Sequence, residues 1–345
     1  MQTLKLFAIA LAFLGAIAAG FFATIRYKRK TQMQFLDSLA SQTISYFCRT
    51  SHMQNGGIID LGQKSAMRPS KWKTPKGYTN HAFKINGVPA ELLKSNASKG
   101  DKAILQLHGG AYIVGFSDTY RSTALKLSKV SAGADVLSID YRIAPEHVHP
   151  AALEDTENAW NWLLDNGYKP ENIILVGDSA GGNLALSLTA KLRDENRPLP
   201  KALICMSPWA DMSAQGPSFT YNLYKDPMFG RAKGAHSGSC LDNPEKLLAY
   251  AGQTDLQDKY LSPVYGDFDR FPPMLLQVGT YELLESDSIT IHDKAKAAGV
   301  DVTLTRYPGM FHTFQLLEDL LPASRKAWYE IEYFLKKQFS CLLSH

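Results

Sequence analysis

The hexapeptide Gly177-Asp178-Ser179-Ala180-Gly181-Gly182 directly follows the apolar run 173–176. A serine in the pattern G-x-S-x-G, on a sharp turn between a buried strand and a helix, is the arrangement that exposes a hydroxyl as a nucleophile. Gly177 and Gly181 would leave room for such a bend. A tight turn with serine as filler fits the same six residues, so the rest of the chain must supply the groups that a nucleophile requires.

A serine hydroxyl reacts at neutral pH only when a nearby base takes its proton, and that base is itself oriented by a third group. On parallel sheets of this kind the partners follow in the order Ser, acid, His, each in a loop after a strand. His312 lies in the loop after the apolar run 302–304, whereas His292 falls inside an expected helix and His345 is the last residue of the sequence. We therefore predict that His312 is the base for Ser179.

The third group is a carboxylate in the loop after the run 274–278. Glu282 is closest to the end of this run. Glu285 and Asp287 are expected in the first turn of a helix, where carboxylates are favoured by the helix dipole. Asp178 is adjacent to the nucleophile and should point away from the imidazole. Glu282 is the preferred acid, with Asp287 as the alternative.

A Gly-Gly pair also follows the apolar run 103–107, in His108-Gly109-Gly110. Glycines allow backbone N–H groups to approach a substrate closely, as stabilisation of an oxyanion requires. Gly109 and Gly110, together with the N–H of Ala180 after the nucleophile, could form a three-donor oxyanion hole. A plain Gly-Gly turn is the alternative, but the position one strand before the serine unit favours the oxyanion hole.

The elements that must position these groups alternate along the chain. The strand-like runs are 103–107, 135–139, 173–176, 202–206, 274–278 and 302–304, and the expected helices are 151–165, 180–193, 286–298 and 322–337. Such alternation predicts an α/β fold with a mostly parallel central sheet and helices on both faces. The stretch of about 209–271 has no clear strand but many aromatic and methionine residues, which is typical of a helical cap or lid. We expect residues 31–80 to form an N-terminal cap or linker and residues 81–345 to form the catalytic domain.

The N-terminal segment differs from the rest of the chain. Residues 6–25 contain no charge and are followed by Arg26-Tyr27-Lys28-Arg29-Lys30. This length suits a single membrane-spanning anchor within residues 1–30, while Ala16-Ile17-Ala18 would fit a cleaved signal peptide instead. The basic residues on the C-terminal side favour a cytoplasmic catalytic domain by the positive-inside rule.

Charge and cysteine content exclude several classes of function. The net charge is +4, of which +5 lies in the first 30 residues, so the remainder carries −1 and offers no basic face for nucleic acid. The four cysteines are Cys48, Cys205, Cys240 and Cys341, and they contain no C-x-x-C. Their wide spacing predicts neither a disulfide framework nor a zinc site.

Four ordered motifs carry a family resemblance. They are His108-Gly109-Gly110, then residues 140–147 (DYRIAPEH), residues 150–155 (PAALED) and residues 177–182 (GDSAGG). Over residues 80–340 the chain resembles the hormone-sensitive-lipase-like branch of α/β-hydrolase esterases. The resemblance implies the α/β-hydrolase fold, a Ser179, Glu282 and His312 triad, and an oxyanion hole at Gly109, Gly110 and Ala180.

In one position the chain departs from this family, which usually has Asp where the chain has Glu282. The family also implies that residues 141–146 and 150–155 shape the loop near the site rather than react. In membrane-anchored animal relatives the catalytic domain faces the lumen, against the orientation that the charges favour.

The expected function is a serine carboxylesterase that cleaves small to medium hydrophobic carboxylic esters through an acyl-enzyme. An amidase, formamidase or lactonase would use the same residues, and a non-catalytic ligand-binding receptor on this fold is a further alternative. No metal or organic cofactor is needed for this chemistry. The expected partners are a small-molecule ester and, through residues 1–30, a membrane. The sequence does not predict the oligomeric state.

Overall fold

The computed structural model describes residues 58–231 and 248–339, together with isolated positions within 35–46 and 234–245. The expected anchor at residues 1–30, Cys48, Cys240, Cys341 and His345 lie outside the described residues. Of the helices in the described part, none is both long and apolar enough to cross a membrane.

The described residues form one sheet of eight strands in the order β1-β2-β4-β3-β5-β6-β7-β8. The strands are β1 (Tyr78–Ile85), β2 (Val88–Ser95), β3 (Ala103–Leu107), β4 (Asp135–Ile139), β5 (Ile173–Asp178), β6 (Ala202–Met206), β7 (Met274–Gly279) and β8 (Val302–Tyr307). Strands β3 to β8 are parallel, and β2 pairs antiparallel with both β1 and β4. The expected mostly parallel sheet is therefore confirmed.

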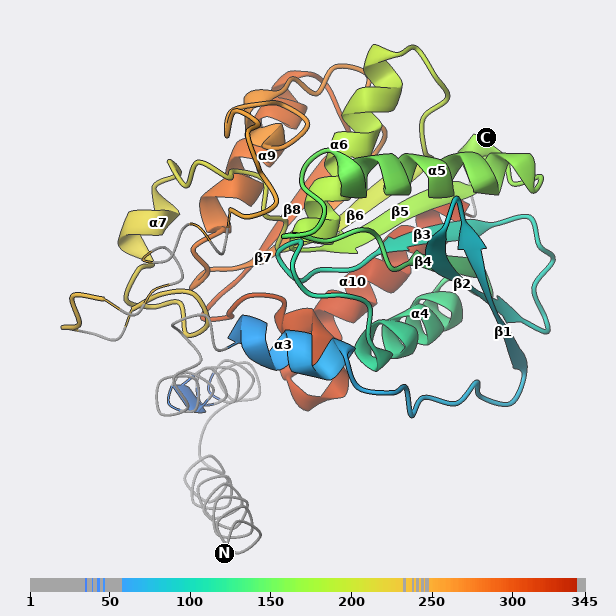
Figure 1. The fold of residues 1–345 in the computed structure, drawn as a ribbon, viewed down its shortest axis with the longest axis horizontal. Coiled ribbons are helices and arrows are strands. Elements are labelled where there is room, and N and C mark those ends of the chain that lie inside the picture. Colours follow the sequence, from blue (N-terminus) through green and yellow to red (C-terminus); the bar gives the residue numbers. More distant parts are fainter. Residues whose placement is uncertain are drawn as a thin grey trace, which may run out of the picture.

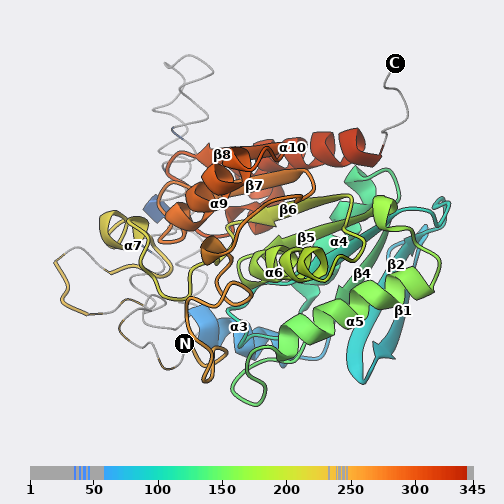
Figure 2. The same cartoon turned by 90° about the horizontal axis from the view of Figure 1, so that it is seen from above.

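Helices cover both faces of this sheet, so the molecule has three layers (Figure 1). One face carries α5 (Ala151–Asp165), α6 (Ala180–Asp194) and α9 (Glu285–Ala297), and the other carries α4 (Asp118–Val130) and α10 (Pro322–Phe339). The short helix α7 (Ser218–Tyr221) lies beyond one end of the sheet in both views (Figures 1 and 2), and α3 (Ile58–Ala66) lies below α10 in Figure 1.

The alternation of side chains along each strand builds the two cores. Leu105, Leu175 and Leu203 pack with the α5, α6 and α9 side, whereas Ile104 and Ile174 pack with α4 and α10. Because successive side chains of a strand point to opposite faces, a strand buried on both faces must be apolar throughout. This explains why the central strands are continuous apolar runs in the sequence.

Strand order also explains where a site can form. From β3 the chain passes outward to β4 and then returns to β5 on the other side of β3, after which β6, β7 and β8 follow in order. Open α/β sheets bind ligands outside the carboxyl ends of the strands, at the point where the winding direction reverses. In this chain that point lies between the loops that follow β3 and β5.

Strands β1 and β2 and helices α3 and α4 were not among the expected elements. The hairpin β1–β2 lies at the sheet edge, and its turn is Asn86-Gly87, with positive φ angles of 48° and 89°. An Asn-Gly pair is the sequence signature of such a turn, so the hairpin could have been predicted from the sequence. The expected boundary between residues 80 and 81 cuts β1, and helices α3 and α4 were not predicted.

Candidate active site

Ser179 lies at the junction of β5 and α6, with φ 53° and ψ −119°. Such angles are costly for a residue with a side chain and persist only where the surroundings enforce them. The enforcement is close packing: a Cβ on Gly177 would lie 2.2 Å from the carbonyl oxygen of Gly181, and one on Gly181 would lie 2.0 Å from that of Leu107. The two glycines let the strand and the helix meet at the sharp bend expected for a nucleophile.

His312 and Glu282 meet at the carboxyl ends of β8 and β7. Nδ1 of His312 lies 2.9 Å from Oε2 of Glu282, and both side chains are buried. An ionised carboxylate only accepts hydrogen bonds, so Nδ1 is the donor and the neutral ring keeps its lone pair on Nε2. That is the tautomer that a base for a serine hydroxyl requires.

The other oxygen of Glu282 is fixed by the neighbouring strands. Oε1 accepts a hydrogen bond from the hydroxyl of Ser207 at 2.8 Å and another from the N–H of Gly279. Ser207 directly follows β6 and also accepts the N–H of Thr313 at 3.3 Å. Ser207 thus ties the acid to the histidine loop, a role that no motif in the sequence signals.

The alternative acid, Asp287, lies elsewhere. Its Oδ2 accepts the N–H groups of Ala210 and Asp211 at 2.8 and 2.9 Å, so it holds the start of the cap segment. Burial and the charge of Asp211 raise the pKa of Asp287 well above its usual range. Glu285 pairs with Arg306 at 2.6 Å instead. Of the carboxylates considered in this loop, Glu282 is therefore the one in contact with His312.

The loop after β3 carries the expected oxyanion donors. The N–H of Gly109 is engaged within the protein, since it donates to the hydroxyl oxygen of Tyr120 at 2.9 Å and to Oδ1 of Asp178 at 3.1 Å. This differs from the expectation that Gly109 donates to an oxyanion. The N–H groups of Gly110 and Ala111 donate to no group in the described part of the chain.

The sequence did not predict a role for the N–H of Ala111, because an alanine after two glycines is not a recognisable motif. Its φ is 53°, and Gly110 before it and Tyr112 after it also have positive φ angles, of 125° and 61°. The N–H of Ala180, the third expected donor, belongs to the first residue of α6, where the N–H groups of a helix have no intrahelical acceptor.

Residues 140–147 pack against the loop after β3 that carries Gly109 and Gly110. The hydroxyl of Tyr141 donates to the carbonyl oxygen of His108 at 2.7 Å, and the two rings stack with centroids 4.1 Å apart. Arg142 bonds Asp155, which belongs to the second expected scaffold motif, at 2.9 Å. Both motifs therefore act on the shape of the loop, as the family resemblance implies.

A cavity of about 350 Å³ opens above Ser179. Ser179, His312, Gly110 and Ala111 all contribute to its wall. The remaining wall is mostly apolar and comes from α3, the loop after β3, the cap segment and the segment after β8; it includes Ile59, Leu61, Val114, Met228, Phe229 and Leu316. Ser179, His312 and the residues with the two unengaged N–H groups, Gly110 and Ala111, thus line one mostly apolar cavity.

The buried side chain of Asp226 connects the cap segment to the loop after β7, which carries Glu282. Oδ1 of Asp226 accepts the N–H groups of Met228 and Phe229 at 2.8 and 2.9 Å, and its Oδ2 accepts the N–H of Leu283 at 2.8 Å. The ring of Phe229 lies 4.8 Å from that of His312. One buried carboxylate therefore holds both the cap wall of the cavity and the loop next to Glu282.

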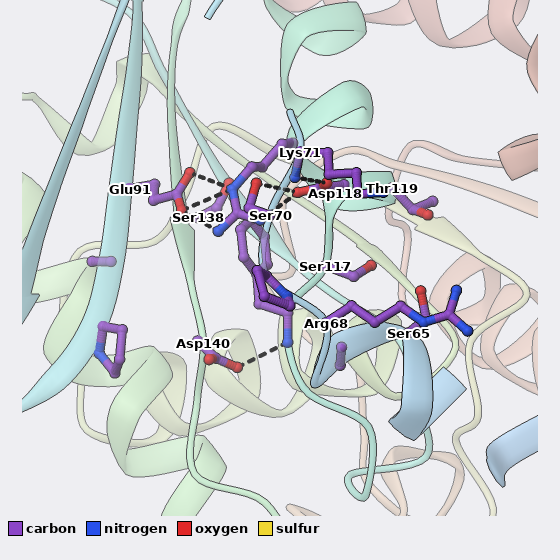
Figure 3. A pocket seen from close by; sticks show the side chains of 16 residues that line it. Ser65, Arg68, Ser70, Lys71, Glu91, Ser117, Asp118, Thr119, Ser138 and Asp140 are labelled. Atoms are coloured by element: carbon purple, nitrogen blue, oxygen red, sulfur yellow. Dashed lines mark hydrogen bonds and ion pairs between the residues drawn. The ribbon is translucent and has the colours of Figure 1, made fainter. Parts of the chain in front are cut away.

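A second cavity, of about 370 Å³, adjoins the first and shares Ser65, Ser117 and Thr119 with it. Its wall is charged and includes Glu91 and Asp118, which lie near each other (Figure 3). Arg121 bonds both carboxylates, and Asp118 also accepts the N–H groups of Lys71 and Trp72. Asp118 thus attaches the segment after α3 to the start of α4.

His292 pairs with Asp293 on the surface of α9, as expected for a histidine without a catalytic role. Among the described residues, no group of three or more His, Cys, Asp or Glu side chains is arranged to hold a metal ion. Cys205 is buried in β6, and its burial raises the pKa of the thiol to about 12.

Comparisons with known proteins agree with this geometry. A family model for the alpha/beta hydrolase fold matches residues 104–316. An acetyl-hydrolase of Streptomyces hygroscopicus is 36% identical over 231 residues, covering 67% of this chain and 74% of the relative. An esterase of Acinetobacter venetianus is 32% identical over 254 residues, covering 73% and 80%.

A solved structure of an esterase from the bacterial hormone-sensitive lipase family superposes with a TM-score of 0.71 at 35% identity. The match covers 83% of this chain and 98% of that one. The chain therefore belongs to the hormone-sensitive-lipase-like esterases of the α/β-hydrolase fold and is a carboxylic ester hydrolase.

Proposed function

We propose that the chain is a serine carboxylesterase that cleaves small to medium hydrophobic esters through an acyl-enzyme, with Ser179, His312 and Glu282 as its triad. The observation that carries this proposal is the 2.9 Å contact between Nδ1 of His312 and Glu282, beside a strained Ser179 in the same cavity. This contact holds the His312 imidazole in the tautomer that can take a proton from the hydroxyl of Ser179.

In the first step Nε2 of His312 accepts the hydroxyl proton while Oγ of Ser179 attacks the ester carbonyl carbon. The imidazolium is stabilised by Glu282 and then protonates the leaving alcohol. A water molecule, deprotonated by the same nitrogen, attacks the acyl-enzyme and releases the acid. In acylation the proton passes from Ser179 through His312 to the leaving alcohol. In deacylation a proton from water passes through His312 to the departing Oγ of Ser179, so both residues end the cycle as they began it.

The negative charge that develops on the carbonyl oxygen requires donors in place beforehand. We assign this role to the N–H groups of Gly110, Ala111 and Ala180. Gly109 is left out because its N–H is occupied by Tyr120 and Asp178. Removal of one such donor costs about 10²–10³ in turnover in serine hydrolases.

The apolar wall supports an apolar acyl or alcohol group. Met228, Phe229 and Leu316 surround the space next to His312, and a cavity of about 350 Å³ holds a short to medium chain rather than a long one. The residues of about 209–271 thereby act as the cap that sets substrate size.

The test is hydrolysis of p-nitrophenyl esters of increasing acyl length by the purified full-length chain in a nonionic detergent, beside Ser179→Ala. We expect turnover to be highest for short to medium acyl chains and to be lost in the variant. Activity that survives Ser179→Ala would refute the triad. Matched anilides and lactones identify an amidase, formamidase or lactonase, and absence of turnover on all of them favours a binding protein.

We also propose that residues 6–25 anchor the enzyme in a membrane by a single span, with the catalytic domain on the cytoplasmic side. The support is the uncharged length of 20 residues and the basic cluster at residues 26–30. Protease added to sealed right-side-out vesicles should leave the catalytic domain intact. Digestion would favour the opposite, luminal or secreted, orientation, and release of the chain from washed membranes would favour a cleaved signal peptide.

A further inference from the structure

Asp178 precedes the nucleophile and is buried, yet the proposed reaction gives it no proton to carry. Its two oxygens have separate partners: Oδ1 accepts the N–H of Gly109 at 3.1 Å, and Oδ2 accepts the hydroxyl of Tyr120 at 3.1 Å. Since Gly109 also donates to Tyr120 at 2.9 Å, the three groups form a closed triangle. A buried carboxylate is costly unless it is hydrogen-bonded, so these hydrogen bonds are what allow Asp178 to lie buried beside Ser179.

The triangle lies directly against the loop that carries the oxyanion donors. Leu107 pairs with Gly177 in the register of β3 and β5, which brings Gly109 next to Asp178. A Cβ on Gly109 would lie 2.3 Å from Oδ2 of Asp178, so only glycine fits between the loop and the carboxylate.

Beyond Gly109, three successive residues have positive φ angles, and two of them, Ala111 and Tyr112, have side chains. Such a backbone persists only when neighbouring groups hold it in place. The N–H of Gly109 is the last donor before the strained stretch, and Asp178 and Tyr120 are the groups that hold it.

We propose that Asp178 and Tyr120 are positioning residues for ester hydrolysis: the Asp178 carboxylate fixes Gly109 so that the next two N–H groups, of Gly110 and Ala111, face the carbonyl oxygen at Ser179. This inference rests on the proposed function. Asp178 is not a second triad acid, because its oxygens are occupied by Gly109 and Tyr120 while Nδ1 of His312 faces Glu282.

The strength with which Asp178 fixes Gly109 depends on the charge of the carboxylate, because hydrogen bonds to a charged acceptor are roughly twice as strong as neutral ones. Burial raises the pKa of Asp178 to about 6, and the Tyr120 hydroxyl, the His312 charge and the Gly109 N–H oppose this rise. The titratable groups that act on Asp178 in the described part of the chain are Tyr120 on α4, Tyr141 after β4 and His312 after β8. Below about pH 6 Asp178 is protonated, and the hydrogen bond from Gly109 therefore no longer has a charged acceptor.

The test compares kcat and KM from about pH 5 to pH 9 for wild type, Asp178→Asn and Tyr120→Phe. We expect Asp178→Asn to lower kcat by about 10²-fold, as for loss of an oxyanion donor, with little change in KM. Its acid limb should move to lower pH, because position 178 no longer takes up a proton near pH 6. Tyr120→Phe removes a bond that lowers the pKa of Asp178, so its acid limb should move to higher pH.

A matched control is Tyr168→Phe. The hydroxyl of Tyr168 donates to the buried carboxylate of Asp135 at 2.6 Å, at the opposite end of β4 from the site, and its loss should leave the pH profile unchanged. Acid limbs that do not move in opposite directions in Asp178→Asn and Tyr120→Phe would overturn the proposal. If Asp178→Asn does not fold, the upward shift in Tyr120→Phe alone decides. If Ser179→Ala retains activity, the proposed function itself fails.

Discussion

Replacement of Glu282 by aspartate tests the acid of the triad with a change of one methylene group. In the wild-type chain the carboxylate spans two fixed points, since Oε2 lies 2.9 Å from Nδ1 of His312 and Oε1 lies 2.8 Å from the hydroxyl of Ser207. Shortening the side chain withdraws the carboxylate by about 1.5 Å, the length of one C–C bond. The contact with His312 then lengthens toward about 4 Å, unless the bond to Ser207 breaks instead.

The backbone cannot follow the shorter side chain. A Cβ on Gly279 would lie 2.3 Å from the carbonyl oxygen of Met310, so the loops after β7 and β8 are already in close contact. At about 4 Å the carboxylate still attracts an imidazolium but no longer fixes its tautomer. Glu282→Gln, which keeps the length but loses the charge, should lower kcat by about 10⁴-fold, as for the amide replacement of a triad acid. We expect Glu282→Asp to lie between this value and wild type, with kcat reduced about 10²-fold.

The assay is kcat for a short-chain p-nitrophenyl ester at about pH 8, with thermal unfolding as a check of folding. Asp287→Asn is the matched control, because Asp287 is equally buried but bonds Ala210 and Asp211 rather than His312. The reasoning fails if Asp287→Asn abolishes turnover in a folded protein, or if Glu282→Gln stays within 10-fold of wild type.

Three further outcomes follow from single substitutions. A pKa for Asp178 that rises from its usual 3.8 to about 6 on folding means that the native state binds its proton more tightly. The ionised residue therefore costs about 3 kcal/mol above pH 6. Asp178→Asn should raise the free energy of unfolding above pH 6 by up to this amount, with the gain vanishing near pH 4, which urea titrations at both pH values measure. Asn183 bonds the Tyr112 hydroxyl and the carbonyls of Trp209 and Leu261, so Asn183→Ala should cost about 3 kcal/mol by urea unfolding, and a loss under 1 kcal/mol would contradict this. Phe229→Ala should raise the ratio of kcat/KM for hexanoyl over acetyl esters by about 10-fold, and an unchanged ratio would remove Phe229 from the cavity wall.

The sequence predicts most of the sheet because its central strands are buried on both faces. Runs such as 103–107 and 202–206 coincide with β3 and β6, since a strand enclosed by two helical layers has to be apolar at each position. The edge hairpin β1–β2 escapes this rule. Residues of β1 alternate between exposed and half-buried, so its sequence contains Asn80, His81 and Lys84 and lacks a continuous apolar run.

Loop positions at strand ends also proved predictable, since chain order fixes which loops meet at the carboxyl edge of a parallel sheet. Glu282 and His312 are brought together because β7 and β8 are neighbours, as their order in the sequence suggests. Ser207 has no comparable signal. Its hydroxyl reaches Glu282 only because β6 lies beside β7 and the loops after both strands turn the same way.

The proposed oxyanion donors depend on contacts between distant segments as well as on the local motif. Two glycines after β3 indicate a backbone that can approach a substrate, and this holds for either Gly109 or Gly110. The N–H of Gly109 is already bonded to Asp178 on β5 and to Tyr120 on α4. The N–H of Gly110 is therefore the one left for a substrate. A donor committed inside the protein fixes the loop, and the next two donors can then face the substrate without reorganising during the reaction. In the proposed reaction Asp178, beside Ser179, is therefore as much a part of the oxyanion site as the glycines that signal it.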